Sequence, residues 1–158
     1  MPKRYGQLFE ACFTPEGLLD AYHEARRGKR NSAAVKRFER DLGANLARLH
    51  DELHTSAYAP QPYRQFWIPS GGKERLIAAP AFRDVVVQHA IYREVLPIFE
   101  RTWIDQSHGC RPGYGIHSAR DQLQRYMRQS PEGSYTLQMD IRKFYYRLDR
   151  SVLADMLA

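Results

Sequence analysis

Residues 63–103 read YRQFWIPSGGKERLIAAPAFRDVVVQHAIYREVLPIFERTW, and two structural patterns follow one another in this stretch. Branched and aromatic residues on either side of the turn sequence PSGGK predict two strands, over 63–68 and 74–79, joined as a hairpin. The longer apolar-rich segment 82–103 predicts a helix, in which Pro97 would cause a break or a kink. A hairpin that leads into a long helix indicates a helix-rich α+β fold.

Two helices are predicted on the N-terminal side of this hairpin. Residues 14–29 begin with Thr14 as a favourable N-cap and Pro15 in the first turn, and Gly28 suits the end of the helix. One long helix is expected next, because its apolar residues recur at steps of three and four and so share one face: Val35, Phe38, Leu42, Leu46, Leu49 and Leu53. Its other face carries cations, which a solvated surface also explains: Lys36, Arg37, Arg40 and Arg48.

The C-terminal side begins with residues 104–115, which are rich in glycine and polar residues and predict a loop. A helix is predicted over 116–129, with these apolar residues turned inward: Ile116, Ala119, Leu123 and Met127. Apolar and polar residues alternate over 134–141, which predicts a strand, and Asp149 can cap a last helix. A single strand cannot satisfy its own backbone groups, so its partner is expected to be the hairpin or a segment absent from this chain.

The bulk composition is that of a globular protein, and its positive charge suggests an anionic partner. The chain has 158 residues, enough for one domain with a core, and its hydrophobic content is 43%. The net charge is +6 and the pI is near 9.5. Most of the basic residues are arginines, whose planar guanidinium suits phosphate groups. Charge alone leaves a soluble basic protein with no nucleic-acid role as an equal alternative.

Two cysteines, Cys12 and Cys110, form neither a disulfide framework nor a zinc-ligand pattern. A reduced, cytoplasmic setting is therefore expected. The first residues lack the apolar run of a signal peptide, and no segment reaches the ~20 apolar residues of a membrane helix. The sequence thus predicts no membrane association.

Asp140 is the first candidate for chemistry. It lies near the end of the predicted strand, facing away from the apolar side. Its carboxylate, together with the carbonyl oxygen of Ile141, offers the oxygen ligands that Mg²⁺ prefers. The structural alternative is an ion pair with Arg142 or Lys143.

Two cations, Lys73 and Arg75, follow the hairpin turn, where they could bind a triphosphate. The structural alternative is that these charges keep an edge strand from aggregating. In the loop after the long helix, His108, Cys110 and His117 do not have the spacing of a zinc site.

Three blocks taken together resemble a known family. The blocks ERLIAAPAFRDVVVQHAIYREVLPIFE (74–100), HGCRPGYGIHSARDQL (108–123) and QMDIRKFYYRLD (138–149) resemble the N-terminal half of prokaryotic reverse transcriptases, the enzymes of group II introns, retrons and diversity-generating retroelements. The first block looks closest to the diversity-generating class. The resemblance covers residues 63–158, and its specificity comes from three blocks in the correct order.

The resemblance implies a right-hand polymerase, in which fingers are followed by the start of the palm. Asp140 matches the first catalytic aspartate. Ile141, the next residue, is implied to contact the metal ion through its carbonyl oxygen and also the nucleotide. Tyr145 matches the aromatic steric gate that excludes a ribose 2′-OH by shape. Arg75 matches the fingers arginine on the nucleotide phosphates, and Lys73 would assist it.

Template contacts are also implied by the resemblance. Arg83 and Asp84 match a fingers pair that supports the template and nucleotide pocket. Arg111, Pro112 and Gly113 match a block that lies along the template or the nascent base pair. The implied partners are an RNA template, a DNA primer and a deoxynucleoside triphosphate, and the implied cofactor is Mg²⁺, two ions of which promote nucleotidyl transfer.

The match is incomplete, because family members supply a further pair of aspartates in a Tyr-x-Asp-Asp turn. The sequence contains no Asp-Asp pair, and it has Tyr146 where relatives often carry an acid. We therefore expect a truncated polymerase that is inactive alone, with a C-terminal palm–thumb chain as a partner. The alternatives are a non-catalytic nucleic-acid-binding module and one half of a split polymerase.

Three segments follow from this interpretation. Residues 1–62 are expected to form a helical N-terminal extension, residues 63–133 the fingers, and residues 134–158 the start of the palm.

Overall fold

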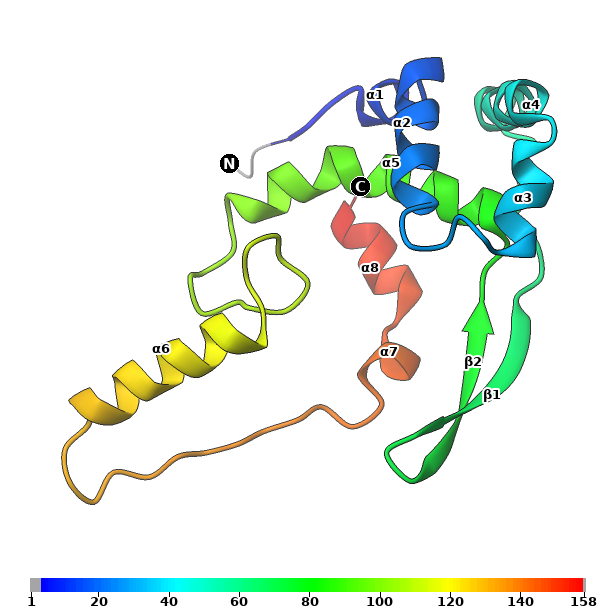
Figure 1. The fold of residues 1–158 in the computed structure, drawn as a ribbon. Coiled ribbons are helices and arrows are strands. Elements are labelled where there is room, and N and C mark those ends of the chain that lie inside the picture. Colours follow the sequence, from blue (N-terminus) through cyan, green and yellow to red (C-terminus); the bar gives the residue numbers. More distant parts are fainter. Residues whose placement is uncertain (1–3, 158) are drawn as a thin grey trace. The chain divides into compact units, whose positions relative to one another are not determined.

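The computed structural model describes residues 4–157 of the chain. Helices dominate, and the described residues contain one two-stranded antiparallel sheet (Figure 1), which confirms the helix-rich α+β class. The chain divides into two compact units, of which the first ends at Asp105 and the second begins at Gln106. This division lies inside the segment 63–133 assigned to the fingers, whose functional boundaries stay predictions.

Two short helices open the first unit: α1 (Leu8–Cys12) and α2 (Pro15–Ala25). The predicted cap of α2 is confirmed, since Thr14 Oγ1 accepts a hydrogen bond from the Gly17 amide at 2.9 Å. The helix ends earlier than predicted, and turns follow it up to residue 31. Gly28 has a φ of 73° there, a left-handed conformation that glycine adopts without strain.

The single long helix predicted after this turn is wrong, because the structure divides it into α3 (Ala33–Glu39) and α4 (Leu42–His54). Asp41 has φ −141° and ψ 59°, which interrupts the helical backbone. The Asn45 side-chain amide donates to the Phe38 carbonyl at 2.9 Å and so satisfies an acceptor that the break leaves open. The shared apolar face survives the break, because its residues are buried or packed against the core.

The predicted hairpin is confirmed as β1 (Arg64–Ser70) and β2 (Lys73–Ala79), and it extends away from the helices of the first unit (Figure 1). Gly71 and Gly72 form its two-residue loop with φ of 59° and 76°. Positive φ at both loop residues defines a type I′ turn, whose twist matches that of paired strands. The helix that follows is α5 (Phe82–Glu100), which contains Pro97 in its last turn and continues past it.

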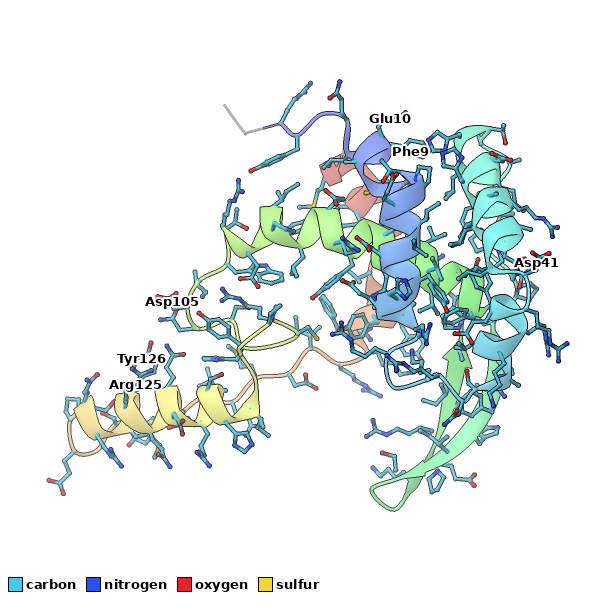
Figure 2. The ribbon with its side chains drawn as sticks, turned by 45° about the horizontal axis from the view of Figure 1, so that its top comes forward. Phe9, Glu10, Asp41, Asp105, Arg125 and Tyr126 are labelled. Atoms are coloured by element: carbon cyan, nitrogen blue, oxygen red, sulfur yellow. The ribbon has the colours of Figure 1, made fainter. Side chains whose placement is uncertain are left out.

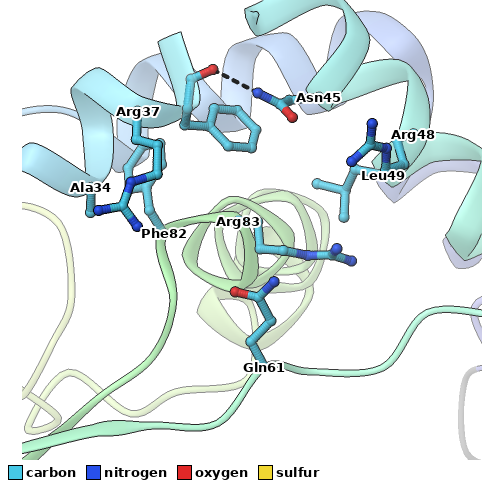
Figure 3. Close-up of a pocket in the computed structure, with 9 residues that line it drawn as sticks. Ala34, Arg37, Asn45, Arg48, Leu49, Gln61, Phe82 and Arg83 are labelled. Atoms are coloured by element: carbon cyan, nitrogen blue, oxygen red, sulfur yellow. Dashed lines mark hydrogen bonds between the residues drawn. The ribbon is translucent and has the colours of Figure 1, made fainter. Parts of the chain in front are cut away.

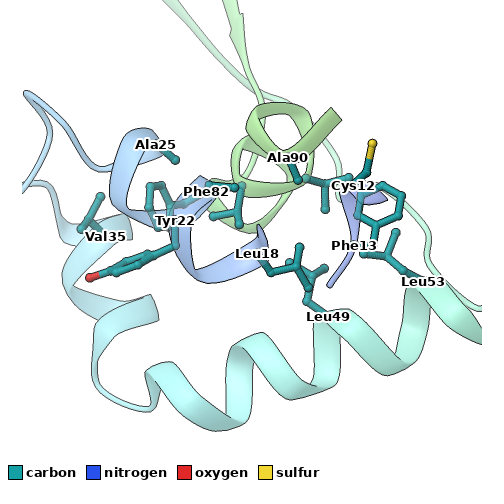
Figure 4. Packing of buried hydrophobic residues seen from close by; sticks show 13 residues of the cluster. Cys12, Phe13, Leu18, Tyr22, Ala25, Val35, Leu49, Leu53, Phe82 and Ala90 are labelled. Atoms are coloured by element: carbon teal, nitrogen blue, oxygen red, sulfur yellow. The ribbon is translucent and has the colours of Figure 1, made fainter. Parts of the chain in front are cut away.

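The hydrophobic core lies where α1, α2 and α3 pack on α5 and α4 packs on α2 (Figure 4). Its fully buried side chains come from α2, α3, α4 and α5, with Leu18 and Val86 at 0% exposure. The complete cluster is the following: Cys12, Phe13, Leu18, Ala21, Tyr22, Ala25, Val35, Leu49, Leu53, Phe82, Val86, Val87 and Ala90. Residues from the predicted N-terminal extension thus share one core with the helix that follows the hairpin.

Polar contacts fasten the same helices at their surface. Phe9 and Glu10 on α1 (Figure 2) both reach His54 at the end of α4, with Glu10 Oε2 3.5 Å from the imidazole Nε2. Arg93 on α5 donates to Asp20 on α2 at 3.0 Å. These exposed pairs contribute little to stability individually. Their positions show that sequence-distant helices pack side by side.

The second unit contains α6 (Ile116–Gln129), α7 (Phe144–Arg147) and α8 (Arg150–Leu157). Helix α6 was predicted correctly, and Figure 2 labels Arg125 and Tyr126 on it. The inward orientation of its apolar residues was wrong, because Ile116 is 81% and Met127 is 61% exposed. The described side chains of residues 106–156 include no buried hydrophobic residue, so the second unit has no hydrophobic core of its own.

The cap predicted for the last helix is confirmed. Asp149 Oδ1 accepts hydrogen bonds from the Ser151 amide at 2.9 Å and from the Ser151 hydroxyl at 2.6 Å. These bonds hold the pKa of the Asp149 carboxyl below its ordinary value, because they favour the charged form.

The predicted strand over 134–141 is wrong for this chain. Residues 134–140 have no regular secondary structure, and the only sheet among residues 4–157 pairs β1 with β2. Tyr135 is fully exposed and Met139 is 81% exposed, although both belong to the apolar side of the alternation. The physical reason is the absence of a paired neighbour, without which alternation does not produce a strand.

No helix within residues 4–157 combines the length and the apolar character that crossing a membrane requires.

Candidate nucleic-acid interface

The strand register places the cations of the hairpin on one face. Arg75 lies opposite Ile68 and Lys73 opposite Ser70. Because side chains alternate along a strand, Lys73 and Arg75 share a face. Arg64 belongs to that face as well, with its guanidinium carbon 4.7 Å from the centre of the Phe66 ring. This face of the hairpin therefore carries three exposed cations, of which Lys73 and Arg75 lie near the turn and Arg64 at the opposite end. Binding of a triphosphate by Lys73 and Arg75 stays a prediction.

Asp84 occupies a buried position at the start of α5, where it is 3% exposed. Its Oδ1 accepts from the Tyr58 hydroxyl at 2.8 Å, and its Oδ2 accepts from the Gln61 amide at 2.9 Å. Both contacts lie in the segment that enters the hairpin. Asp84 thereby ties that segment to α5, and burial together with the hydrogen bond to this carboxylate raises the pKa of Tyr58.

Arg83 lies beside Asp84 and pairs with Glu52 on α4 through two guanidinium nitrogens. Its guanidinium carbon is also 5.3 Å from the centre of the Tyr58 ring. The hydrogen bond from Arg83 is the main reason why the pKa of Glu52 is lowered. In this structure Arg83 and Asp84 act as supports of the first unit, and their contact with a template stays a prediction.

A pocket beside Arg83 was not predicted as a site. Its lining includes Arg37 and Arg48 (Figure 3), which the sequence analysis placed on a solvated helix face. The spacing of 11 residues between them is close to three helical turns, so helical periodicity alone could have placed them on one side. The break between α3 and α4 and the approach of α5 could not be read from that periodicity.

The loop before α6 contains the third predicted group. Arg111 is 8% exposed, donates to the Ser107 carbonyl at 3.1 Å and lies 4.0 Å above the centre of the Tyr114 ring. Pro112 follows it, and Gly113 has a φ of 77° that favours glycine. This part of the loop is therefore an ordered turn around the buried side chain of Arg111.

Histidine in the same loop has a structural role. His108 contacts the Ser118 hydroxyl at 2.9 Å and the Gln122 amide oxygen at 2.6 Å, and so joins the loop to α6. Both ring nitrogens are thereby engaged.

The segment around Asp140 is open. Asp140 and Ile141 are exposed in an irregular stretch, and Lys143 has a left-handed φ of 55° just before α7. Tyr145 is 83% exposed, with its ring centre 5.2 Å from that of Phe144. None of these side chains is locked by packing.

A complete metal site is not formed within residues 4–157, since no three His, Cys, Asp or Glu side chains gather where they could hold an ion. Asp140 and the Ile141 carbonyl would supply two oxygen ligands of the kind that Mg²⁺ prefers. Two ligands do not by themselves hold the ion, so a magnesium centre stays a prediction that needs further donors.

The predicted site residues are divided between the two units. Lys73, Arg75, Arg83 and Asp84 belong to the first unit, and Arg111 to Tyr145 belong to the second. Within the first unit, the Arg83–Asp84 pair and the hairpin are linked through Gln61. A single pocket shared by Arg75, Tyr145 and Asp140 stays a prediction.

Comparison with known proteins finds partial matches. No protein-family profile matches the chain. It is 40% identical over 79 residues to Protein YkfC of Escherichia coli (strain K12). The aligned stretch covers 49% of this chain and 21% of that protein. It is 26% identical over 114 residues to the group II intron-encoded protein LtrA of Lactococcus lactis subsp. cremoris. The aligned stretch covers 71% of this chain and 18% of that protein.

These similarities support the resemblance found in the sequence blocks. The chain is distantly related to a group II intron-encoded protein, and reverse transcriptases of group II introns are one of the classes that its blocks resemble. The chain spans about a fifth of the length of the relatives named here. The closer likeness to the diversity-generating class stays a prediction.

Proposed function

We propose that this chain supplies the fingers and the Asp140-bearing segment of an RNA-directed DNA polymerase. The observation that carries the proposal is the similarity to a group II intron-encoded protein across 71% of the chain. The three sequence blocks and the cationic hairpin face agree with the same class.

In this proposal each predicted residue has a role of its own. Asp140 and the Ile141 carbonyl contribute oxygen ligands to Mg²⁺, which when bound activates a primer 3′-OH and stabilises the leaving pyrophosphate. Arg75 and Lys73 balance the charge of the incoming triphosphate. Tyr145 closes the sugar pocket against a 2′-OH.

Template binding is the part assigned to the remaining residues. Arg83 and Asp84 support the template side of the fingers, and Arg111 to Gly113 lie along the template. Such contacts go mostly to phosphates and hold nucleic acid largely independently of sequence.

The test is primer extension on an RNA template with Mg²⁺, in a polymerase completed by a polypeptide that carries the Tyr-x-Asp-Asp turn. The Asp140→Ala variant is expected to abolish synthesis, because a carboxylate ligand of the metal is removed. RNA binding by the same variant should be unchanged, since Asp140 carries no positive charge toward phosphates. Asp155→Ala, an exposed aspartate on α8, is the matched control and should keep synthesis.

The second candidate is a nucleic-acid-binding module without catalysis. It is favoured by the absence of a complete metal cluster among residues 4–157 beside an exposed set of hairpin cations. In the completed polymerase, equal synthesis with the Asp140→Ala variant and with the parent chain would remove Asp140 from the chemistry. This chain would then be a nucleic-acid-binding module. The parent chain by itself is expected to incorporate no nucleotide. Co-purification with a palm–thumb chain would identify one half of a split polymerase.

A further inference from the structure

The pocket beside Arg83 is a concave site that the predicted roles do not use. It has a volume of about 260 Å³ and opens between α3, α4, the segment before β1 and the start of α5 (Figure 3). Its lining residues are Ala34, Arg37, Phe38, Asn45, Arg48, Leu49, Gln61, Phe82 and Arg83. All of them belong to the first unit, so the pocket is defined by one compact body.

Positive charge dominates this lining. It contains three guanidinium groups, from Arg37, Arg48 and Arg83, and no carboxylate. Glu52 neutralises Arg83 from outside the lining. Among residues 4–157 neither Arg37 nor Arg48 forms an ion pair, although the Glu52 carboxylate also interacts electrostatically with Arg48. Figure 3 shows these two arginines on opposite sides of the pocket, one from α3 and one from α4.

The rest of the lining combines apolar rings with amides. Phe38 and Phe82 pack edge to face with ring centres 5.4 Å apart, and Leu49 extends this apolar wall. The side-chain amides of Asn45 and Gln61 add hydrogen-bonding groups, which suit the polar edge of a heterocycle. Asn45 is held by its bond to the Phe38 carbonyl, and the Gln61 backbone by its bond to Asp84.

We propose that this pocket binds one unstacked nucleotide of a single-stranded RNA. Its phosphate lies between Arg37 and Arg48, and its base lies against the wall of Phe38, Leu49 and Phe82. Guanidinium groups match phosphate oxygens in geometry and charge, and bases pack on aromatic side chains without regard to sequence. A phosphate ion would leave the apolar wall unused.

Size restricts the ligand further. The volume of this pocket is slightly smaller than that of ordinary small-molecule pockets, which begin at about 300 Å³. One nucleotide fits this scale, and a base-paired duplex does not. The choice of RNA rests on the proposed polymerase function, whereas the nucleotide chemistry rests on the pocket alone.

The experiment measures binding of a fluorescein-labelled 12-nucleotide uridine RNA to the whole chain by anisotropy. The double variant Arg37→Gln/Arg48→Gln is expected to weaken binding about tenfold and to lower the salt slope by about one to two, as lost phosphate contacts do. The matched control Lys36→Gln/Arg40→Gln removes the same charge from exposed positions outside the lining. It should change the affinity less than about twofold. Thermal melting of both variants checks that the fold is retained.

Competitors identify the chemistry and the source of the ligand. Uridine monophosphate should displace the RNA only at far higher concentration than an unlabelled strand, and inorganic phosphate should be weaker still. Equal loss in both double variants, or displacement by phosphate as effective as by uridine monophosphate, would overturn the proposal. Tight binding of free uridine monophosphate with no binding of the strand would overturn it as well.

The outcome is separable from that of the proposed polymerase function. Asp140→Ala tests synthesis and leaves this pocket intact, since Asp140 belongs to the other unit. A chain that binds RNA through Arg37 and Arg48 but never supports synthesis would retain the pocket and lose the polymerase. Synthesis without any effect of these arginines on RNA binding would do the reverse.

Discussion

Asp84 shows how one buried carboxylate organises the approach to the hairpin. Its two oxygens accept from the Tyr58 hydroxyl and the Gln61 amide, and Arg83 Nε lies 3.7 Å from it. A buried carboxylate without such partners would be costly. The position of the segment before β1 therefore depends on hydrogen bonds that reach 23 and 26 residues along the chain.

The first prediction concerns Tyr58. The Tyr58→Phe variant keeps the ring but leaves Asp84 Oδ1 without its hydroxyl donor, and so should lower the free energy of unfolding by about 1–3 kcal/mol. Urea denaturation measures the change. Tyr63→Phe, in which the ring is 57% exposed, is the control and should shift it by less than about 0.5 kcal/mol. Equal stability of the parent and Tyr58→Phe would mean that this hydrogen bond does not hold the segment.

Sequence patterns could identify Arg83 and Asp84 but not their partners. The resemblance marked both residues through an Arg-Asp pair, and helical spacing could not show that Tyr58 and Glu52 meet them. Those contacts depend on how α4 and α5 pack. Long-range packing is the information that local periodicity lacks.

The hairpin is the element in which sequence and structure agree most closely. Its turn chemistry alone sets the loop, because Gly71 and Gly72 both take positive φ. The loop then sets the register, in which Trp67 lies opposite Leu76 and Arg75 opposite Ile68. The common face of the cations follows from this register, and thus from two glycines.

The second prediction tests that dependence. Gly72→Val places a branched side chain at φ 76°, which costs about 1–2 kcal/mol, and the hairpin should lose its register. The measurement is the cross-strand nuclear Overhauser effect between Trp67 and Leu76. Gly71→Asn is the control, because asparagine tolerates this conformation in such turns. A full Overhauser effect in Gly72→Val would show that pairing, not the turn, determines the register.

Two elements show why a correct pattern can predict the wrong structure. Residues 134–141 have strand alternation but no partner strand in the described chain, so they stay irregular. The apolar steps from Val35 to Leu53 are helical, yet the backbone breaks at Asp41 and keeps the same buried face. In both cases the pattern identified an apolar face of the segment. The backbone conformation depended instead on which other segments pack or pair with it.

At the scale of the whole molecule, the hydrophobic core belongs to one unit. The buried hydrophobic residues of the described chain run from Cys12 to Ala90, all before the division at Asp105. In the second unit, α6 exposes Ile116 and Met127, and the irregular stretch exposes Tyr135. Burial of apolar surface is the main favourable term in folding, so cooperative stability should reside in the first unit.

The third prediction separates the units at their boundary. A fragment of residues 4–105 should unfold cooperatively, with a thermal midpoint within about 4 °C of that of the whole chain, which corresponds to about 1 kcal/mol for a domain of this size. A fragment of residues 106–157 should show helical signal without a sharp transition, because it has no core to melt. Circular dichroism during heating measures both fragments. A loss of the transition in the first fragment, or a sharp transition in the second, would show that the core of the first unit is not the source of cooperative stability.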